Sequence, residues 1–251
     1  MLAQLNTPAI IAHRGASAHA PENTLSAFKL AIEKQADAIE LDAKLCASGE
    51  VVVVHDATLD RTTNGTGKVN ETSLSDLKVL DAGSWFDDKF ASERIPTLDE
   101  VFGIIGDQIP INVELTNYTS AGDDLAVKVA ALVKRHKLTG SVFFSSFHPL
   151  TLSRARRAIP EVPCAFLTLD GFGGWLARNI IALFLSHQVI QPPYMNVTKR
   201  LITRAHRRGK RVNSYTINDA EIMRRLFSWG IDGIFTDDVP LARQVRAEVS
   251  A

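Results

Sequence analysis

The sequence predicts an α/β fold, a TIM-type (β/α)8 barrel, from three observations. The chain has 251 residues, and one barrel of this type needs roughly 250. Short apolar runs with strand periodicity alternate with helical stretches, a pattern typical of a parallel sheet covered by helices. The hydrophobic share of 45% is enough to bury a sizeable core.

Nine segments have the composition of β-strands, although a closed barrel has only eight places for them. At least one of the nine is therefore an extra strand. Between them we expect helices, the first opening at Glu22 and running to about Lys34 with Asn23 or Thr24 as its N-cap. The nine segments are residues 9–12, 38–45, 51–54, 111–115, 142–144, 165–169, 188–191, 211–216 and 233–236.

The connection after the second strand is unusual because residues 43–50 are too few for a helical crossover. A hairpin at Ser48-Gly49 would set Asp42 opposite His55, whereas a parallel crossover without a helix is the alternative. Residues 57–95 are polar and rich in turn signals. We expect them to form a small subdomain inserted after the third strand of a single domain, residues 1–251.

Charge and cysteine content exclude several classes of protein. Lysine plus arginine and aspartate plus glutamate both number 28, which argues against a nucleic-acid-binding protein, since these usually present a basic surface. We interpret the basic cluster at 203–211 as a solvated helix end. The two cysteines, Cys46 and Cys164, form no disulfide framework and are expected to be buried thiols.

The chain shows neither a signal peptide nor a membrane-spanning segment. The N-terminus lacks a charged region followed by a long apolar stretch. The longest apolar run, residues 180–185, is far shorter than the roughly 20 residues that span a bilayer. We therefore expect a cytoplasmic enzyme.

Polar residues gather at the carboxyl ends of the first four predicted strands, where barrel enzymes form their active sites. Glu40 and Asp42 lie two apart on one strand, so both carboxylates point to the same face. Glu114 lies on the fourth strand between apolar neighbours. Three converging carboxylates would repel one another unless a hard divalent cation with oxygen ligands lay between them.

Two histidines and an arginine complete this constellation. His13 and Arg14 follow the first strand and His55 follows the third. Imidazoles titrate near neutral pH and suit acid and base catalysis, and a guanidinium fork suits phosphate oxygens. Carboxylates for a metal, two histidines and one arginine together indicate phosphoryl chemistry. Each residue alone would more often be structural, and only the combination favours a catalytic site.

At these residues the chain resembles the glycerophosphodiester phosphodiesterase family, which belongs to the phosphatidylinositol-phospholipase-C-like phosphodiesterases. The resemblance covers nearly the whole chain and consists of several blocks in the same order. The blocks read IAHRGASAHAPENTLSAF, AIELDAKLCASGEVVVVHDATLDRTTNGTG, SWFDDKF, IPTLDEVF, NVELTN, SSFHP, YTIND and GIDGIFTDDVP.

The resemblance implies a TIM barrel with a small insertion at its mouth and assigns roles to the residues. His13 and His55 would be the acid–base pair, and Arg14 a phosphate contact. Mg2+ or Ca2+ would be held by Glu40, Asp42 and Glu114. A neighbouring glycerol hydroxyl would attack phosphorus to give a cyclic phosphate, which water then opens to sn-glycerol 3-phosphate.

Two positions depart from the family pattern. Thr116 takes the place of a lysine that usually follows the fourth-strand glutamate by two residues. A cation from the insertion, for instance Lys68 or Lys89, would be one source of compensation. Tyr215 replaces a tryptophan and keeps an aromatic wall. We expect Arg14, Thr116 and Tyr215 to lie at the substrate.

The expected substrates are small deacylated phospholipids such as glycerophosphocholine and glycerophosphoethanolamine. Two alternatives stay open: a lysophospholipase D, and a barrel that binds glycerophosphodiesters without hydrolysing them. The segment from Gly171 through Leu185 is rich in apolar residues. We interpret it as a barrel helix with an apolar stripe, and the alternative is a lip around Phe172 and Trp175 that receives a lysophospholipid chain.

Overall fold

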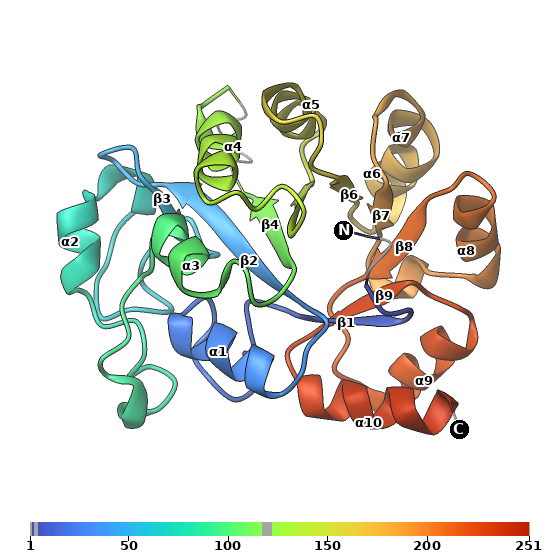
Figure 1. The fold of residues 1–251 in the computed structure, drawn as a ribbon, viewed down its shortest axis with the longest axis horizontal. Coiled ribbons are helices and arrows are strands. Elements are labelled where there is room, and N and C mark those ends of the chain that lie inside the picture. Colours follow the sequence, from blue (N-terminus) through green and yellow to red (C-terminus); the bar gives the residue numbers. More distant parts are fainter. Residues whose placement is uncertain (1, 3–4, 117–121, 251) are drawn as a thin grey trace.

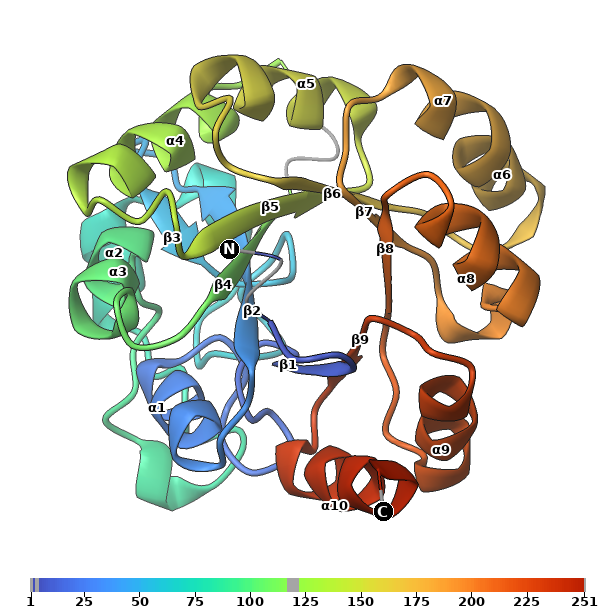
Figure 2. The same ribbon diagram turned by 45° about the vertical axis from the view of Figure 1, so that its right-hand side comes forward.

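The structure, a computed structural model, describes residues 2, 5–116 and 122–250. Its centre is a closed barrel of parallel strands surrounded by helices (Figures 1 and 2). Strand β1 pairs with β9 on one side and with β2 on the other, and this double pairing closes the sheet. The predicted TIM barrel is confirmed.

Eight strands form the barrel and each is three to eight residues long. They are β1 (Ala9–Ala12), β2 (Ala38–Leu45), β4 (Ile111–Leu115), β5 (Val142–Ser146), β6 (Cys164–Leu167), β7 (Val189–Gln191), β8 (Arg211–Ser214) and β9 (Gly233–Thr236). The predicted segments at 165–169 and 211–216 extended too far, because their last residues already belong to the loops of the barrel mouth.

The outer ring consists of helices that follow the strands. They are α1 (Leu25–Glu33), α3 (Leu98–Ile105), α4 (Leu125–Arg135), α5 (Pro149–Ala158), α6 (Gly171–Leu176), the π-helix η4 (Ala177–Ile181), α7 (Ala182–Phe184), η5 (Tyr194–Asn196), α8 (Lys199–His206), α9 (Ala220–Ser228) and α10 (Val239–Ser250). None of the helices in these described ranges is long and apolar enough to cross a bilayer.

The ninth strand, β3 (Val51–Val53), lies outside the barrel and pairs antiparallel with β2. The Ser48-Gly49 hairpin is therefore correct, and Gly49 adopts φ +91° in its turn. One detail of the prediction was wrong: the register pairs Ala43 with Val53, and Val54 N donates to Asp42 O at 3.0 Å. Val54, rather than His55, thus faces Asp42, because the hairpin loop is one residue shorter than the prediction required.

The segment after β3 packs against the β2–β3 hairpin and contains the short elements η2 (Val69–Glu71), α2 (Leu74–Val79) and η3 (Asp88–Phe90). A small apolar cluster holds it to the hairpin, and the two cysteines are buried free thiols, as predicted. The cluster consists of Cys46, Val52, Val54, Leu59, Val69, Leu77, Ala82 and Ile95.

The barrel interior has an apolar floor below a polar layer. Inward side chains of the strands, among them Ile11, Phe143 and Phe235, form an apolar cluster that fills this part of the barrel. Above it, buried polar side chains of β4, β5 and β7 are hydrogen-bonded to one another. The polar layer faces the cavity at the carboxyl ends of the strands, which Ser145 and Gln191 help to line.

Candidate active site

A cavity of about 300 Å³ opens at the carboxyl ends of the barrel strands. It is lined by seven of the residues singled out above: His13, Arg14, Glu40, Asp42, His55, Glu114 and Tyr215. The other lining residues are Ser145, Phe147, Leu167, Gln191, Thr216 and Phe235. Of the predicted site residues, Thr116 does not line it.

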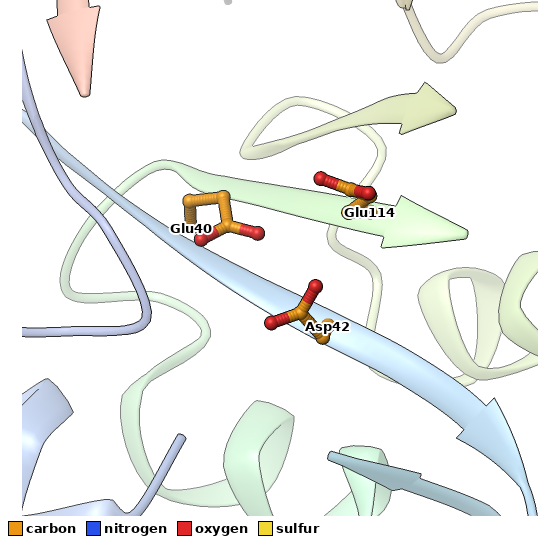
Figure 3. A group of neighbouring side chains, drawn as sticks. All are labelled: Glu40, Asp42 and Glu114. Atoms are coloured by element: carbon orange, nitrogen blue, oxygen red, sulfur yellow. The ribbon is translucent and has the colours of Figure 1, made fainter. Parts of the chain in front are cut away.

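The three carboxylates point toward one another from two neighbouring strands (Figure 3). Glu40 and Asp42 project inward from β2, and the β2–β4 register sets Asp42 opposite Glu114. One oxygen of each lies within 4.8 Å of the others. Burial and repulsion by Asp42 and Glu114 raise the pKa of Glu40 well above its ordinary value, although Arg14 opposes this.

Such a set of oxygen donors fits a hard divalent cation. Mg2+ and Ca2+ are bound in proteins by carboxylate oxygens, and a positive ion between the three groups would remove the repulsion that burdens Glu40. The residues present therefore fit the predicted metal, with Glu40, Asp42 and Glu114 as the groups that would hold it.

Arg14 is fixed against these carboxylates from the loop after β1. Its backbone takes the left-handed conformation at φ 56°, which turns its N–H toward Glu40 Oε2 at 2.9 Å. Its Nη1 donates to Glu22 Oε1 at 2.7 Å, and its Nε lies 3.3 Å from Asp42 Oδ2. The guanidinium therefore borders both the cavity and the carboxylate cluster.

Asn23 holds Asp42 in place, a role that the sequence did not reveal. Its Nδ2 donates to Asp42 Oδ2 at 2.9 Å, and its Oδ1 accepts from the Asp42 N–H at 3.3 Å. Thr24, rather than Asn23, is the N-cap of α1, since Thr24 Oγ1 accepts from Ala27 N. Of the two N-cap alternatives, the structure therefore selects Thr24 and frees Asn23 for the site.

Each histidine is oriented by an aspartate that was not singled out from the sequence. His13 Nδ1 lies 2.7 Å from Asp237 Oδ1, and His55 Nδ1 lies 2.7 Å from Asp56 Oδ1. With Nδ1 donating to a carboxylate, Nε2 of each ring is the nitrogen left for chemistry. The only signal in the sequence was position: Asp56 follows His55 directly, and Asp237 follows β9.

Both aspartates are themselves held as anions. The hydrogen bond from Arg61 is the main cause that holds the pKa of Asp56 far below its ordinary value, and His55 contributes. Burial alone would raise the pKa of Asp237, but hydrogen bonds from His13, Asn218 and Ser17 lower it instead. Each imidazole therefore faces a permanent negative charge at neutral pH.

Lys44 supplies the positive charge beside Thr116. It follows Glu40 and Asp42 on the same face of β2, and its Nζ donates to Thr116 Oγ1 at 2.7 Å. Neither Lys68, paired with Glu71, nor Lys89, paired with Asp87, takes this place. Lys44 was not singled out from the sequence, although the alternation of charged residues along β2 was a signal that could have indicated it.

Tyr215 forms one wall of the cavity. Its hydroxyl donates to Thr168 O at 2.8 Å, and its ring meets that of Phe147 edge-on, with centroids 5.9 Å apart. Burial, followed by the nearby Glu114 charge, raises the pKa of the Tyr215 hydroxyl. The residue is therefore a neutral aromatic wall whose hydroxyl is already engaged.

The floor of the cavity carries Gln191, which the sequence also did not reveal. Its Nε2 lies 3.3 Å from Asn112 Oδ1, and Asn112 in turn donates to Ser145 Oγ at 2.6 Å. Gln191 is fully buried, and its Oε1 has no hydrogen-bond partner among the described residues. This oxygen can accept a hydrogen bond from a ligand hydroxyl.

The chain is similar over most of its length to proteins of one known family. Residues 13–241 match the model of the glycerophosphoryl diester phosphodiesterase family. A glycerophosphodiester phosphodiesterase of Caldanaerobacter subterraneus is 38% identical, over 91% of this chain and 93% of its own length. One of Bacillus subtilis is 31% identical, over 94% and 85%.

Solved structures of the same family share the fold. A phosphodiesterase of Oleispira antarctica, in complex with the product sn-glycerol-3-phosphate, superposes with a TM-score of 0.87 at 30% identity and covers 98% of both chains. An Agrobacterium tumefaciens glycerophosphodiester phosphodiesterase gives 0.81 at 31% identity, over 94% of this chain and 99% of its own. The chain belongs to the glycerophosphoryl diester phosphodiesterase family, and it is a phosphoric diester hydrolase.

Proposed function

We propose that this enzyme hydrolyses glycerophosphodiesters, such as glycerophosphocholine and glycerophosphoethanolamine, to sn-glycerol 3-phosphate and an alcohol in a cation-dependent reaction. The observation that carries the proposal is one cavity in which two aspartate-oriented histidines flank a cluster of three carboxylates. The Oleispira relative was solved with sn-glycerol-3-phosphate. Such substrates are deacylated phospholipids, so we assign the enzyme to phospholipid and glycerol metabolism in the cytoplasm.

The histidine pair moves the protons in the proposed mechanism. Nε2 of one histidine removes the proton from the glycerol hydroxyl next to the phosphoester, and that oxygen attacks phosphorus. The bond from phosphorus to the leaving alcohol breaks, and the other histidine donates its proton to the departing oxygen. This leaves a cyclic phosphate, which water opens to sn-glycerol 3-phosphate as the two histidines exchange roles.

The remaining groups bind and orient the substrate in this scheme. A cation held by Glu40, Asp42 and Glu114 would neutralise phosphate oxygens and stabilise the charge that develops in the transition state. Arg14 borders the same position and can donate to phosphate oxygens. Gln191 Oε1 can accept from a glycerol hydroxyl at the cavity floor, and Tyr215 covers the side.

The experiment measures glycerol 3-phosphate released from glycerophosphocholine and glycerophosphoethanolamine. It is run with EDTA, and then with Mg2+ or Ca2+ restored, on the wild type and His13→Ala. We expect release that needs the cation and that falls by about 10²–10⁴-fold in His13→Ala. A folded protein that releases nothing with any cation would contradict the proposal.

A second candidate, lysophospholipase D activity, is favoured by one observation. Phe172 and Trp175 are exposed and stacked, with ring centroids 6.1 Å apart, in the segment just after Thr168, which contacts Tyr215. These rings can receive the acyl chain of a lysophospholipid. Trimming both to alanine should then lower hydrolysis of long-chain lysophospholipids and spare glycerophosphocholine, and undiminished lysophospholipid hydrolysis would rule this candidate out.

A further inference from the structure

The helical segment α6–η4–α7 carries apolar side chains on its outer surface. Helices of an enzyme surface usually turn polar residues outward, yet Phe184 is 85% exposed and Phe172 76%. Between Gly171 and Ser186 the only charged side chain is Arg178. An apolar surface of this kind marks a site of interaction with a membrane or another protein. The exposed apolar residues of the segment are Phe172, Trp175, Ile180, Ile181, Leu183 and Phe184.

The same part of the chain has an extreme charge distribution. No aspartate or glutamate occurs between Asp170 and Asp219, although the whole chain has equal numbers of acidic and basic residues. No lysine or arginine of that stretch forms an ion pair with a carboxylate of the described residues, whereas His206 lies 2.7 Å from Asp232 Oδ2. The basic residues are Arg178, Lys199, Arg200, Arg204, Arg207, Arg208, Lys210 and Arg211.

A second cavity, of about 250 Å³, lies where the two features meet, between the α6–α7 segment and α8. Arg178, Arg204, Arg208 and Lys210 line it together with apolar Leu183 and Ala182, and no acidic residue of the described chain does. Arg204 Nη1 donates to Asn179 Oδ1 at 3.0 Å and so ties α8 to η4. In both ribbon views α6, α7 and α8 lie side by side on the outside of the barrel (Figures 1 and 2).

His187 does not contribute charge to this cavity at neutral pH. Lys210 Nζ lies 2.7 Å from its Nε2. Burial, together with the Lys210 charge, lowers the pKa of His187 to about 4. The neutral ring accepts from the ammonium group, and the positive charge of the cavity belongs to the arginines and to Lys210.

We propose that this surface, the α6–α8 face, binds peripherally to membranes that contain anionic phospholipid. The outward apolar side chains of α6, η4 and α7 would enter the boundary between headgroups and acyl chains, as in interfacial helices with aromatic and aliphatic residues. The unpaired basic residues of α8 and of the loop that follows it would face the negative headgroups. The cavity between them would receive a headgroup phosphate.

The charge distribution favours a membrane over the other possible occupants. A second copy of the chain, docked by the same face, would bring two sets of unpaired basic residues together, which is repulsive. A nucleic acid would use the basic residues and leave Leu183 and Phe184 exposed to water. An anionic bilayer offers negative charge and an apolar interior within one surface, and so satisfies both features.

The test is sedimentation of the purified enzyme with vesicles of phosphatidylcholine alone and of phosphatidylcholine mixed with phosphatidylglycerol. We expect binding to the mixed vesicles that weakens as salt rises. The charge variant Arg204→Gln/Arg208→Gln/Lys210→Gln should weaken binding roughly a hundredfold, because each basic residue near an anionic surface contributes a factor of roughly five. The apolar variant Leu183→Ser/Phe184→Ser should also lose most binding.

Matched variants elsewhere on the barrel distinguish a specific effect of the α6–α8 face on vesicle binding from the effect of any surface substitution. Lys29→Gln/Lys134→Gln/Lys137→Gln removes three exposed lysines from other sides of the barrel, and Val79→Ser removes an exposed apolar residue of α2. Both should bind the mixed vesicles like the wild type. All variants should hydrolyse glycerophosphocholine at the wild-type rate, which shows that they are folded.

Several outcomes would overturn the proposal. One is an enzyme that stays in the supernatant with both kinds of vesicle. Another is equal loss of binding in the matched variants and in the face variants. A third is a protein that does not bind vesicles but self-associates, or binds a short single-stranded DNA, through the residues of this face. The surface would then be assigned to that partner instead.

Discussion

At the scale of single residues, the aspartate behind each histidine decides which imidazole nitrogen is available. Asp237 accepts from His13 Nδ1 and is held by Asn218 and Ser17. An asparagine there can donate to Nδ1 and so favour the wrong tautomer, with the proton on Nε2. We expect Asp237→Asn to lower kcat by about 10²–10⁴-fold with little change in KM, measured as steady-state hydrolysis of glycerophosphocholine.

The neighbouring aspartate provides the matched control. Asp238 lies 3.3 Å from His19 and caps α10 through Leu241 N, a hydrogen bond that asparagine can also accept. Asp238→Asn should therefore keep the wild-type kcat. If Asp237→Asn changed only KM, or if both variants lost activity equally, Asp237 would not be positioning His13.

Lys44 is the second residue whose role can be measured. Lys44 lies two residues after Asp42 on β2, closer to the barrel mouth than the Asp42–Glu114 pair, and its Nζ donates a hydrogen bond to Thr116 Oγ1. A cation at this point attracts an anionic phosphodiester. We expect Lys44→Gln to raise KM about tenfold, or about 1.4 kcal/mol, and to leave kcat nearly unchanged in the same assay.

The neighbouring strand allows a rescue. Lys44→Gln/Thr116→Lys moves the charge across the β2–β4 register to position 116, and should restore most of the lost affinity. A double variant no better than Lys44→Gln would show that Lys44 acts through its bond to Thr116 instead of through its charge.

Residues of this site differed in how visible they were in the sequence. Glu40, Asp42 and Glu114 were visible because strand alternation fixes the face on which each side chain lies. Asp237 and Gln191 were not, since their importance depends on which strands become neighbours when the barrel closes. That pairing joins residues more than 200 positions apart, and local sequence periodicity carries no information about it.

At the scale of elements, the start of α1 gives adjacent residues separate tasks. Asn23, at φ 59°, holds Asp42 with its amide, and Thr24 caps the helix. We expect Asn23→Gly, which tolerates this backbone conformation, to raise the cation concentration needed for activity by about 10–100-fold. The measurement is a titration of activity with Mg2+ or Ca2+.

Thr24→Ala is the companion variant. It removes the cap and should cost about 1 kcal/mol of unfolding free energy, measured by urea denaturation, with an unchanged cation requirement. The reverse result would be a larger rise in the cation concentration needed for activity in Thr24→Ala than in Asn23→Gly. It would show that the helix as a whole, and not the Asn23 amide, supports Asp42.

The hairpin of β2 and β3 shows both the strength and the limit of prediction for elements. The eight residues of 43–50 excluded a helical crossover, and Ser48-Gly49 indicated the turn, yet the predicted register was one residue off. Side-chain alternation fixes only which face a residue occupies, whereas register depends on the loop geometry at Cys46–Glu50. His55 nevertheless lines the cavity, because the chain bends after Val54.

At the scale of the molecule, the number of predicted strands and the order of the polar residues at their ends were sufficient to predict the barrel. Parallel strands that each end in the same layer bring their terminal residues together whatever the intervening helices contain. The α6–α8 face was not predicted, because the basic cluster at 203–211 was interpreted locally as a helix end. Its significance depends on the apolar helix that the fold sets beside it.

The carboxylate cluster also links function to the stability of the whole barrel. Burial and two neighbouring carboxylates raise the pKa of Glu40, so its contribution to stability is fully present below its unfolded-state pKa and is lost as pH rises through the folded value. At pH 7.5 without a cation, the buried Glu40 carboxyl therefore lowers the free energy of unfolding of the protein.

Glu40→Gln should consequently separate stability from activity. In EDTA at pH 7.5 we expect its Tm to exceed that of the wild type, because glutamine places no charge among the buried carboxylates. Wild type at a cation concentration of 100 times Kd should gain about 2.7 kcal/mol, whereas Glu40→Gln should gain little and be inactive. Scanning calorimetry with and without Mg2+ or Ca2+ measures both. A wild type that ignores the cation, together with a destabilised Glu40→Gln, would mean that the three carboxylates are a structural network held by Arg14 and Asn23, with no site for an ion between them.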